Sequence, residues 1–334
     1  MASGSSGPGL DLDGPNTLAV LSAAISEDLA RLRRSEPIVL EGIDPEGIHQ
    51  ARVACRRLRS RLRTFAPALR PNKAERLAAE LGWLGRRLGA VRDLDVLADR
   101  LRLDLEGLAG PLATAVLRRC RTDRQEAFDA ARRALAGGRY LRLVAALGEA
   151  AAAPPLRRRA AGLPAAAVLL PELRRHWDDL EHEVVVLPPG PSDPQLHHVR
   201  ILAKRARYAA EAASFLGSAE IERLAGRLAK LQKVLGELND ASKAVSWLEA
   251  AKREPWPSSL HGEGPPRVGD SPSWAPDTLV AVETALSAEH RSLAALRLRW
   301  PASYDRAVRA ARELGWMPEE PIGWAPPGSP APPP

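Results

Sequence analysis

Cysteine and aromatic residues are scarce in this 334-residue chain, and both shortages narrow what the protein can be. The two cysteines, Cys55 and Cys120, are too few for the disulfide framework of a small secreted domain. We expect both to be buried as small hydrophobic residues. Phe, Trp and Tyr together make up 4% of the sequence, which leaves few rings for stacking on nucleic-acid bases.

Long hydrophobic runs are missing as well. No apolar stretch approaches the roughly 20 residues that a membrane-spanning helix needs, and the N-terminal residues lack the apolar core of a signal peptide. We therefore expect a cytoplasmic protein without a membrane partner. The sequence patterns of nucleotide-binding loops, serine hydrolases and zinc proteases are also absent. We predict no catalytic residue, no metal and no cofactor, and thus a protein that is not an enzyme.

Ala, Leu and Arg dominate instead, and these good helix formers predict an all-α fold. Residues 1–16 and 317–334 are rich in Gly, Ser or Pro, and we expect them to be disordered. Between them we predict a first helical half over 17–150, a linker over 151–163 and a second half over 164–316, which includes a Pro/Gly-rich loop at 254–276. The first helix is predicted at about 17–34, and the last two at about 277–298 and 302–314.

The second half repeats a pattern of the first half. A shift of 148 residues (197 − 49) aligns His49, Arg52, Arg56, Arg57 and Arg59 with His197, Arg200, Lys204, Arg205 and Arg207. Farther along, LGAVRD (88–93) corresponds to LGELND (235–240). A match of such long period indicates an internal duplication rather than a solenoid of short repeats.

The positive charge of the chain, +7 overall, gathers on one stripe of each repeat. Positions 49, 52, 56, 59 and 63 advance by three and four, so they share one helix face beside an apolar stripe. No carboxylate occurs between residues 49 and 65. A solvated face of flat-lying arginines is the plain alternative. However, a row of like charges raises self-repulsion that an anion relieves, and guanidinium groups fit phosphate oxygens well.

These residues resemble the signature of the CHAD family, the conserved-histidine α-helical domain. The family pattern H-x-x-R-V-x-x-R-R-L-R is matched at residues 49–59, L-G-x-x-R-D-x-D-V at 88–96, and H-x-x-R-I-x-x-K-R-x-R-Y-x-x-E at 197–211. The resemblance implies two antiparallel helical bundles, related by a pseudo-two-fold axis, around a basic central cavity. It also implies binding of inorganic polyphosphate and association with polyphosphate granules. We further expect phosphate or sulfate ions to bind in the cavity. The E-x-E-x-K motif of the neighbouring triphosphate-tunnel domain is absent, so we expect a stand-alone member.

The resemblance also assigns site residues. The expected polyphosphate ligands are His49, Arg52, Arg56, Arg59, Arg63, Arg86, Arg92, Arg124, His197, Arg200, Lys204, Arg207, Lys230 and Lys233. For Arg124, an inward cation and a salt bridge are equally compatible with its position. Asp93, Asp240 and Tyr208 are predicted to support these cations. Asp93 and Asp95 do not predict a metal site, because side chains at i and i+2 of a helix diverge.

Two other functions fit a basic helical protein. Nucleic-acid binding is disfavoured by the shortage of aromatic residues, since Tyr208 alone lies beside a basic stripe. A polyphosphate-processing enzyme is disfavoured because hydrolysis of phosphoanhydrides normally uses a metal held by carboxylates, and the stripes are almost free of acids. Binding of polyphosphate without turnover is the function that the sequence favours.

Overall fold

The computed structural model describes residues 14–42, 44–108, 110–253 and 276–316. Within these ranges the chain is helical and contains no β-strand, which confirms the predicted all-α class. The α-helices are α1 (Thr17–Glu41), α2 (Pro45–Thr64), α3 (Pro71–Asp104), α4 (Gly110–Leu135), α5 (Gly138–Ala152), α6 (Ala165–Val185), α7 (Asp193–Ala213), α8 (Ala219–Arg253) and α9 (Pro276–Arg312). Two short 3-10 helices follow α2 and α7, namely η1 (Ala66–Ala68) and η2 (Ser214–Leu216).

The two basic helices begin with strong local signals. At the start of α2, the Asp44 side chain accepts a hydrogen bond from the backbone N–H of Glu46 at 2.8 Å, and Pro45 occupies the first helical position. At the start of α7, Ser192 and Gln195 form a capping box. The predicted cap of α7 was Asp193, which instead lies inside the helix, one residue after the true cap.

Two helices continue through prolines where the sequence predicted an end. α1 runs past residue 34 and through Pro37 to Glu41. α9 passes through Pro301, so the two predicted C-terminal helices are one. A proline removes a single backbone hydrogen bond, and packing on both sides offsets that loss: Trp300 and Tyr304 are both buried in the core. The expected disorder of residues 1–13 and 317–334, and the loop at 254–275, lie outside the described residues.

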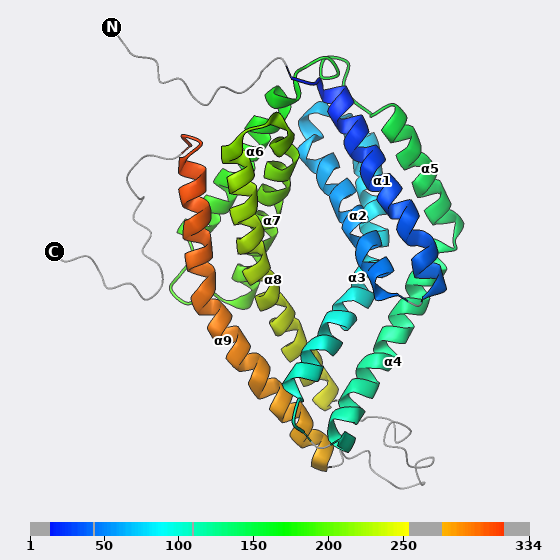
Figure 1. Cartoon of the computed structure of the whole chain (residues 1–334), viewed down its shortest axis with the longest axis vertical. Coiled ribbons are helices and arrows are strands. Elements are labelled where there is room, and N and C mark those ends of the chain that lie inside the picture. Colours follow the sequence, from blue (N-terminus) through cyan, green and yellow to red (C-terminus); the bar gives the residue numbers. More distant parts are fainter. Residues whose placement is uncertain (1–13, 43, 109, 254–275, 317–334) are drawn as a thin grey trace, which may run out of the picture.

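The helices form two groups that lean together at their ends (Figure 1). One group holds α1 to α5 and the other holds α6 to α9, and in each group helices that follow one another along the chain pack side by side. The groups meet where α2 contacts α6 and α7, and again where α3 and α4 contact α9. The arrangement places α2 and α7, which carry the two basic stripes, next to each other.

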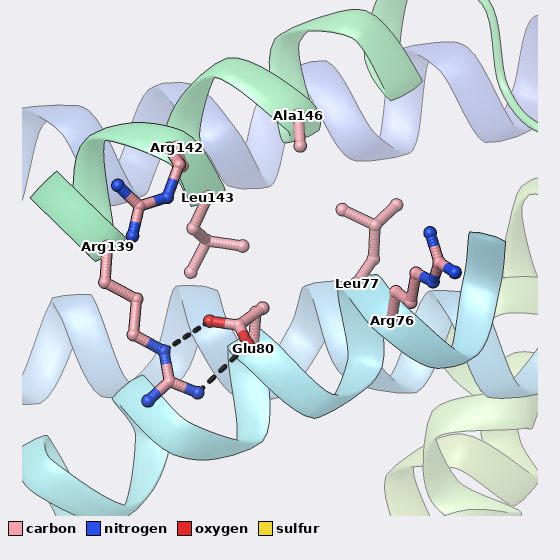
Figure 2. Close-up of a pocket in the computed structure, with 7 residues that line it drawn as sticks. All are labelled: Arg76, Leu77, Glu80, Arg139, Arg142, Leu143 and Ala146. Atoms are coloured by element: carbon pink, nitrogen blue, oxygen red, sulfur yellow. Dashed lines mark hydrogen bonds and ion pairs between the residues drawn. The ribbon is translucent and has the colours of Figure 1, made fainter. Parts of the chain in front are cut away.

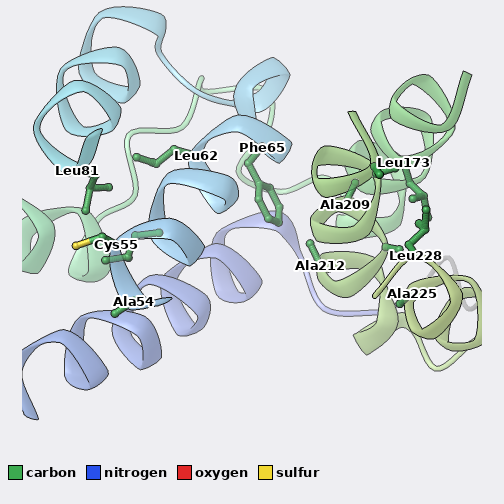
Figure 3. Packing of buried hydrophobic residues seen from close by; sticks show 14 of the residues in the cluster. Ala54, Cys55, Leu62, Phe65, Leu81, Leu173, Ala209, Ala212, Ala225 and Leu228 are labelled. Atoms are coloured by element: carbon green, nitrogen blue, oxygen red, sulfur yellow. The ribbon is translucent and has the colours of Figure 1, made fainter. Parts of the chain in front are cut away.

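The larger hydrophobic core extends across both groups. Phe65, at the end of α2, is completely buried and points toward Ala212 of α7 (Figure 3). Small residues on α7, such as Ala209 and Ala212, allow this close approach. Cys55 lies in the same core, and Cys120 is buried in a second cluster; both thiols are free, as the sequence predicted.

The second hydrophobic cluster lies at the tip where α3 and α4 meet α8 and α9, and alanine recurs through it. Beside it, Arg100 of α3 donates a hydrogen bond from Nε to Oε1 of Glu289 on α9 at 2.6 Å, and the Glu289 side chain is fully buried. Burial, followed by the neighbouring Glu289 carboxylate, raises the pKa of Asp104 to about 6. The buried ion pair of Arg100 and Glu289 thus lies beside this smaller contact between the two groups of helices.

Candidate anion-binding site

A cavity of about 420 Å³ lies between α2, α3, α6 and α7. Its walls come from both groups of helices, and its charged side chains are almost all basic. The lining residues are Arg52, Cys55, Arg56, Arg59, Ser60, Arg63, Thr64, Leu81, Gly82, Gly85, Arg86, His176, Arg200, Ile201, Lys204, Arg205 and Tyr208. We call this space the central cavity.

The two faces of α2 carry arginines with different surroundings. The stripe of Arg52, Arg56, Arg59 and Arg63 lines the central cavity, as the three-and-four spacing predicts. Arg57 and Arg61 instead approach the buried carboxylate of Asp28 on α1, with N–O distances of 3.9 and 3.5 Å. Helical periodicity therefore separates the arginines that line the cavity from those that approach a carboxylate inside the protein.

Several cavity donors are buried without an acceptor. The Nε groups of Arg56, Arg59 and Arg200 and the hydroxyl of Tyr208 have no hydrogen-bond partner among the described residues. Burying a polar group without a partner costs on the order of 1–3 kcal/mol, and more when the group is charged. An anion with several oxygens could satisfy these donors.

Carboxylates are few at the edge of the central cavity. Asp93 lies 3.9 Å from a guanidinium nitrogen of Arg52 and accepts a hydrogen bond from the Lys243 amine at 2.6 Å. Asp240 accepts a hydrogen bond from the Asn239 amide at 3.1 Å. The charge of Asp93 thus offsets two cations at the rim, and its role in supporting anion binding stays a prediction. In the part of the chain that the structure describes, no group of three or more His, Cys, Asp or Glu residues could hold a metal ion.

The pKa values of the cavity cations reflect crowding. Burial, and then the charges of Arg56, Arg200, Arg52 and Arg59, lower the pKa of the Lys204 amine to about 7. Burial and like-charge neighbours also lower the pKa of the Arg56 and Arg63 guanidinium groups. The cavity therefore holds positive charge at an energetic cost, which a bound anion would reduce.

Tyr208 and the glycines of α3 shape the cavity walls. The guanidinium carbons of Arg56 and Arg207 each lie 5.7 Å from the centre of the Tyr208 ring, within cation–π range. A Cβ atom at Gly82 would lie 3.5 Å from Cζ of Arg59, and one at Gly89 would lie 3.7 Å from Nε of Arg52. The side chains of Arg59 and Arg52 thus pass close to the backbone of α3 at these glycines.

The remaining predicted ligands divide into two groups. Arg86 lines the central cavity, and His49 lies beside it, half-buried, with the pKa of its imidazole lowered by burial and by Arg92, Arg56 and Arg52. His197 is exposed, and its Nδ1 lies 2.8 Å from Oδ1 of Asn239.

Seven of the fourteen predicted ligands are not among the residues that line the central cavity: His49, Arg92, Arg124, His197, Arg207, Lys230 and Lys233. Arg207 donates from Nε to Glu211 at 2.6 Å, and Arg124 donates from Nε to Asp95 at 2.6 Å. The latter contact is the salt bridge that the sequence left open. Lys230 and Lys233 are exposed on α8, and the Lys233 side chain keeps 79% of its surface accessible. This face of α8 is turned to solvent. Lys233 therefore lies in different surroundings from Arg86, although both belong to the repeated motif of the two halves.

Sequence reasoning missed four polar lining residues: Ser60, Thr64, His176 and Arg205. Ser60 and Thr64 follow Arg56 at four-residue intervals, so the helical period could have found them. Arg205 was visible as the second cation of the repeated motif. His176 lies on α6, outside both basic stripes, and no sequence pattern pointed to it.

A second pocket of about 280 Å³ lies in an outer groove between α3 and α5 (Figure 2). Arg76, Arg139 and Arg142 surround it, and Leu77 and Leu143 provide apolar surface. Here Arg139 binds both carboxylate oxygens of Glu80, at 2.7 and 2.9 Å, and lies 4.2 Å from the centre of the Trp83 ring. We call this pocket the outer groove; its central arginine already has an anionic partner.

The comparisons with known proteins identify the family. The model of the CHAD domain matches residues 23–249, and the chain belongs to this family. Among solved structures, the CHAD domain from the plant Ricinus communis is 27% identical, with a TM-score of 0.67 over 91% of this chain and 95% of that one. PptA from Streptomyces chartreusis is 23% identical, with a TM-score of 0.68 over 87% of this chain and 100% of that one, and shows the same fold.

No curated protein matches the chain. Among the described helices, none is both long and apolar enough to cross a membrane.

Proposed function

We propose that this protein binds inorganic polyphosphate in the central cavity. The observation that carries the proposal is the set of buried Nε donors of Arg56, Arg59 and Arg200, which lack an acceptor within the described residues. Phosphoryl oxygens accept such donors well, and guanidinium groups bind them in a bidentate manner. Membership of the CHAD family supports the same ligand, because the family resemblance implies polyphosphate binding.

A linear polyanion suits the arrangement of the cations better than a single phosphate ion does. Arg52 and Arg63 are eleven residues apart on α2, which corresponds to roughly 16 Å at a rise of 1.5 Å per residue. Arg200 and Lys204 face them from α7 across the same cavity. A chain of phosphates can contact both rows at once and gain affinity from many weak contacts on one molecule.

Nucleic acid is the competing polyanion. Sequence-tolerant binding of single strands depends on aromatic side chains on which bases stack, and Tyr208 is the one aromatic residue that lines the central cavity. Its ring already contacts Arg56 and Arg207. We therefore expect phosphate contacts without base recognition, and a preference for polyphosphate over DNA.

A competition experiment tests this choice. Long-chain polyphosphate, duplex DNA and single-stranded DNA are titrated against a fluorescent polyphosphate probe at one fixed salt concentration. We expect polyphosphate to displace the probe at the lowest concentration, and the affinity to fall as salt increases because binding releases counterions. DNA that outcompetes polyphosphate, or affinity that is independent of salt, would refute the proposal.

The proposal includes binding without turnover. Phosphoanhydride hydrolysis normally needs a metal held by carboxylates, and Asp93, the carboxylate nearest the stripe of α2, is already engaged by Arg52 and Lys243. We expect purified protein with Mg²⁺ or Mn²⁺ to release no phosphate from polyphosphate above the buffer rate. Release that is lost in Asp93→Asn or Asp240→Asn would assign catalysis to these carboxylates.

Association with polyphosphate granules belongs to the same proposal. A fluorescent fusion should concentrate on granules in cells that accumulate polyphosphate. The fusion carrying Arg56→Glu should spread evenly through the same cells, and identical distributions of the two fusions would contradict granule association through the central cavity.

A further inference from the structure

Lysine is rare in this chain, which makes its position in the central cavity informative. Six of the 48 basic residues are lysines and 42 are arginines (48 − 6 = 42). Lys204 is the one lysine that lines the central cavity, and its nearest charged neighbours are Arg52, Arg56, Arg59 and Arg200. A site that needed only permanent positive charge could use arginine throughout, since arginine stays protonated in proteins.

The other lysines differ from Lys204 in their surroundings. Lys243 donates to Asp93, and Lys252 pairs with Glu283. Lys233 is mostly exposed and lies 4.0 Å from Glu237. Lys204 has no carboxylate within ion-pair distance among the described residues; its surroundings are cationic and half-buried. Of the lysine amines that the structure describes, it is therefore the one held in conditions that favour the neutral form.

A neutral amine is a nucleophile, and the pKa of Lys204 makes the neutral form common. Burial beside four guanidinium groups lowers this pKa to about 7, so near neutral pH the amine is unprotonated far more often than that of an ordinary lysine. Desolvation beside other cations is the established way of activating a lysine. The surrounding guanidinium groups of Arg56 and Arg200 offer donors for phosphate oxygens at the same place.

We propose that Lys204 is an acylation site for small acyl phosphates, whose phosphate group binds the cavity arginines while the acyl carbon faces the lysine amine. This inference rests on the proposed function in one respect, namely that the central cavity binds phosphoryl oxygens. The exposed side chains of Arg63, Arg86 and Arg205 at the edge of the cavity leave it open to small solutes.

The reaction balances without another reactant. The lone pair of Nζ attacks the carbonyl carbon of the acyl phosphate, and an N–C bond forms. The bond between the acyl carbon and the bridging oxygen then breaks, and this oxygen leaves on inorganic phosphate with the electron pair of the bond. The amine loses one proton to the departing phosphate or to water. The product is an uncharged amide in the middle of the cationic rows.

Acylation would regulate the cavity. The amide cannot be protonated, so it removes one positive charge from the contact surface and replaces the amine with a bulkier group. Polyphosphate affinity should then fall, and bound polyphosphate should in turn shield the amine from the reagent. The same side chain would thus link the supply of reactive acyl phosphates to the retention of stored phosphate polymer.

The test uses the full-length protein and acetyl phosphate at pH 7.5, with peptide mass spectrometry as the readout. We expect Lys204 to be acetylated at least ten times faster than Lys233, and we expect inorganic phosphate or polyphosphate to suppress this preference. A parallel sample receives an N-hydroxysuccinimide acetate, which carries no phosphate. Lys204 should be favoured less strongly by that reagent, because the arginines cannot hold it.

Three results would overturn the inference: equal rates at Lys204 and Lys233 with acetyl phosphate, an equal preference with both reagents, or no protection by inorganic phosphate. Polyphosphate binding by the unmodified protein is measured separately. Intact binding without selective acetylation refutes this inference alone, whereas absent binding refutes the proposed function. In Lys204→Arg, acetylation at this position should disappear, while the rate at Lys233 should stay the same as in the original protein.

Discussion

The central cavity and the outer groove are both lined by arginines, but they differ in whether the protein itself neutralises the positive charge. In the outer groove, Glu80 binds Arg139 through both carboxylate oxygens, so the charge is neutralised within the protein. In the central cavity, buried donors of Arg56, Arg59 and Arg200 have no acceptor in the described part of the chain. Arginine content alone therefore says little about anion binding; what matters is whether the protein supplies its own carboxylate.

The same contrast occurs on a single helix. α2 turns Arg56 and Arg59 toward the cavity and Arg57 and Arg61 toward the buried Asp28. Burial raises the pKa of Asp28 even though Arg61 and Arg57 act in the opposite direction. One face of α2 thus presents cations to the cavity, and the other belongs to an ion cluster around Asp28.

Charge reversal in the central cavity should give the largest effect on binding. Arg56→Glu and Lys204→Glu should each weaken polyphosphate binding by on the order of 1–3 kcal/mol, since each removes a charge-assisted contact. This corresponds to roughly 5- to 150-fold in the dissociation constant. Isothermal titration gives the affinity, and circular dichroism checks that helicity is retained. Unchanged affinity in both variants would place the ligand elsewhere.

Substitutions on the opposite face of α2 should lower the stability of the protein and leave polyphosphate affinity almost unchanged. Arg61→Ala removes one of the cations beside buried Asp28, whose side chain is fully inaccessible, and should lower the free energy of unfolding by about 1–3 kcal/mol. Urea denaturation measures this change. Polyphosphate affinity of the folded variant should stay within threefold of the original, and a larger loss would show that this face also contacts the ligand.

Polyphosphate affinity should depend on pH through the charge of the Lys204 amine. Its free pKa is about 7, and a bound polyanion raises that value. Below pH 7 the amine is already charged and affinity should level off. Above pH 7 binding must take up a proton, so affinity should fall by up to tenfold per pH unit. Titrations from pH 6 to 9 test this slope; Lys204→Arg should flatten it, and an equal slope in that variant would assign the effect to other groups.

A substitution in the outer groove should have the smallest effect. Arg139→Ala removes a guanidinium group that Glu80 already neutralises, so polyphosphate affinity should stay within twofold of the original. This variant is the matched control for Arg56→Ala, because each change removes one arginine charge beside a pocket. A tenfold loss in Arg139→Ala would mean that overall charge, rather than the cavity, governs binding.

Much of the site was predictable because helical periodicity is strict. The positions of Arg52, Arg56, Arg59 and Arg63 follow from their spacing, and the duplicated motif pointed to Arg200 and Lys204. Periodicity fixes a face of a helix without fixing what that face meets. Lys230 and Lys233 occupy the expected region of α8 and still face solvent, and Glu211 captures Arg207 from the same helix face.

The fold was predictable in class and less so at the prolines. Asp44 and Pro45 correctly marked the start of α2, because cap chemistry is local. The predicted helix ends before Pro37 and Pro301 were wrong, because α1 and α9 continue through these prolines. Around Pro301, the buried side chains of Trp300 and Tyr304 hold the continuous helix in the core. The contribution of His176 could not be foreseen, since it depends on how α6 packs beside the two basic helices.

The tip at which α3 and α4 meet α8 and α9 should be the first part of the helical structure to unfold locally. Its hydrophobic cluster is smaller than the main core and rich in alanine, so less apolar surface opposes local unfolding. Asp104 there has a pKa of about 6, above its usual 3.8, so the folded tip holds a proton that the unfolded chain releases. The stability that this bound proton gives to the folded tip is fully present below pH 4 and is lost as the pH rises through 6. Amide hydrogens near Asp104 should therefore exchange with deuterium more readily at pH 7 than at pH 5, once intrinsic rates are corrected, while those of α2 keep their protection.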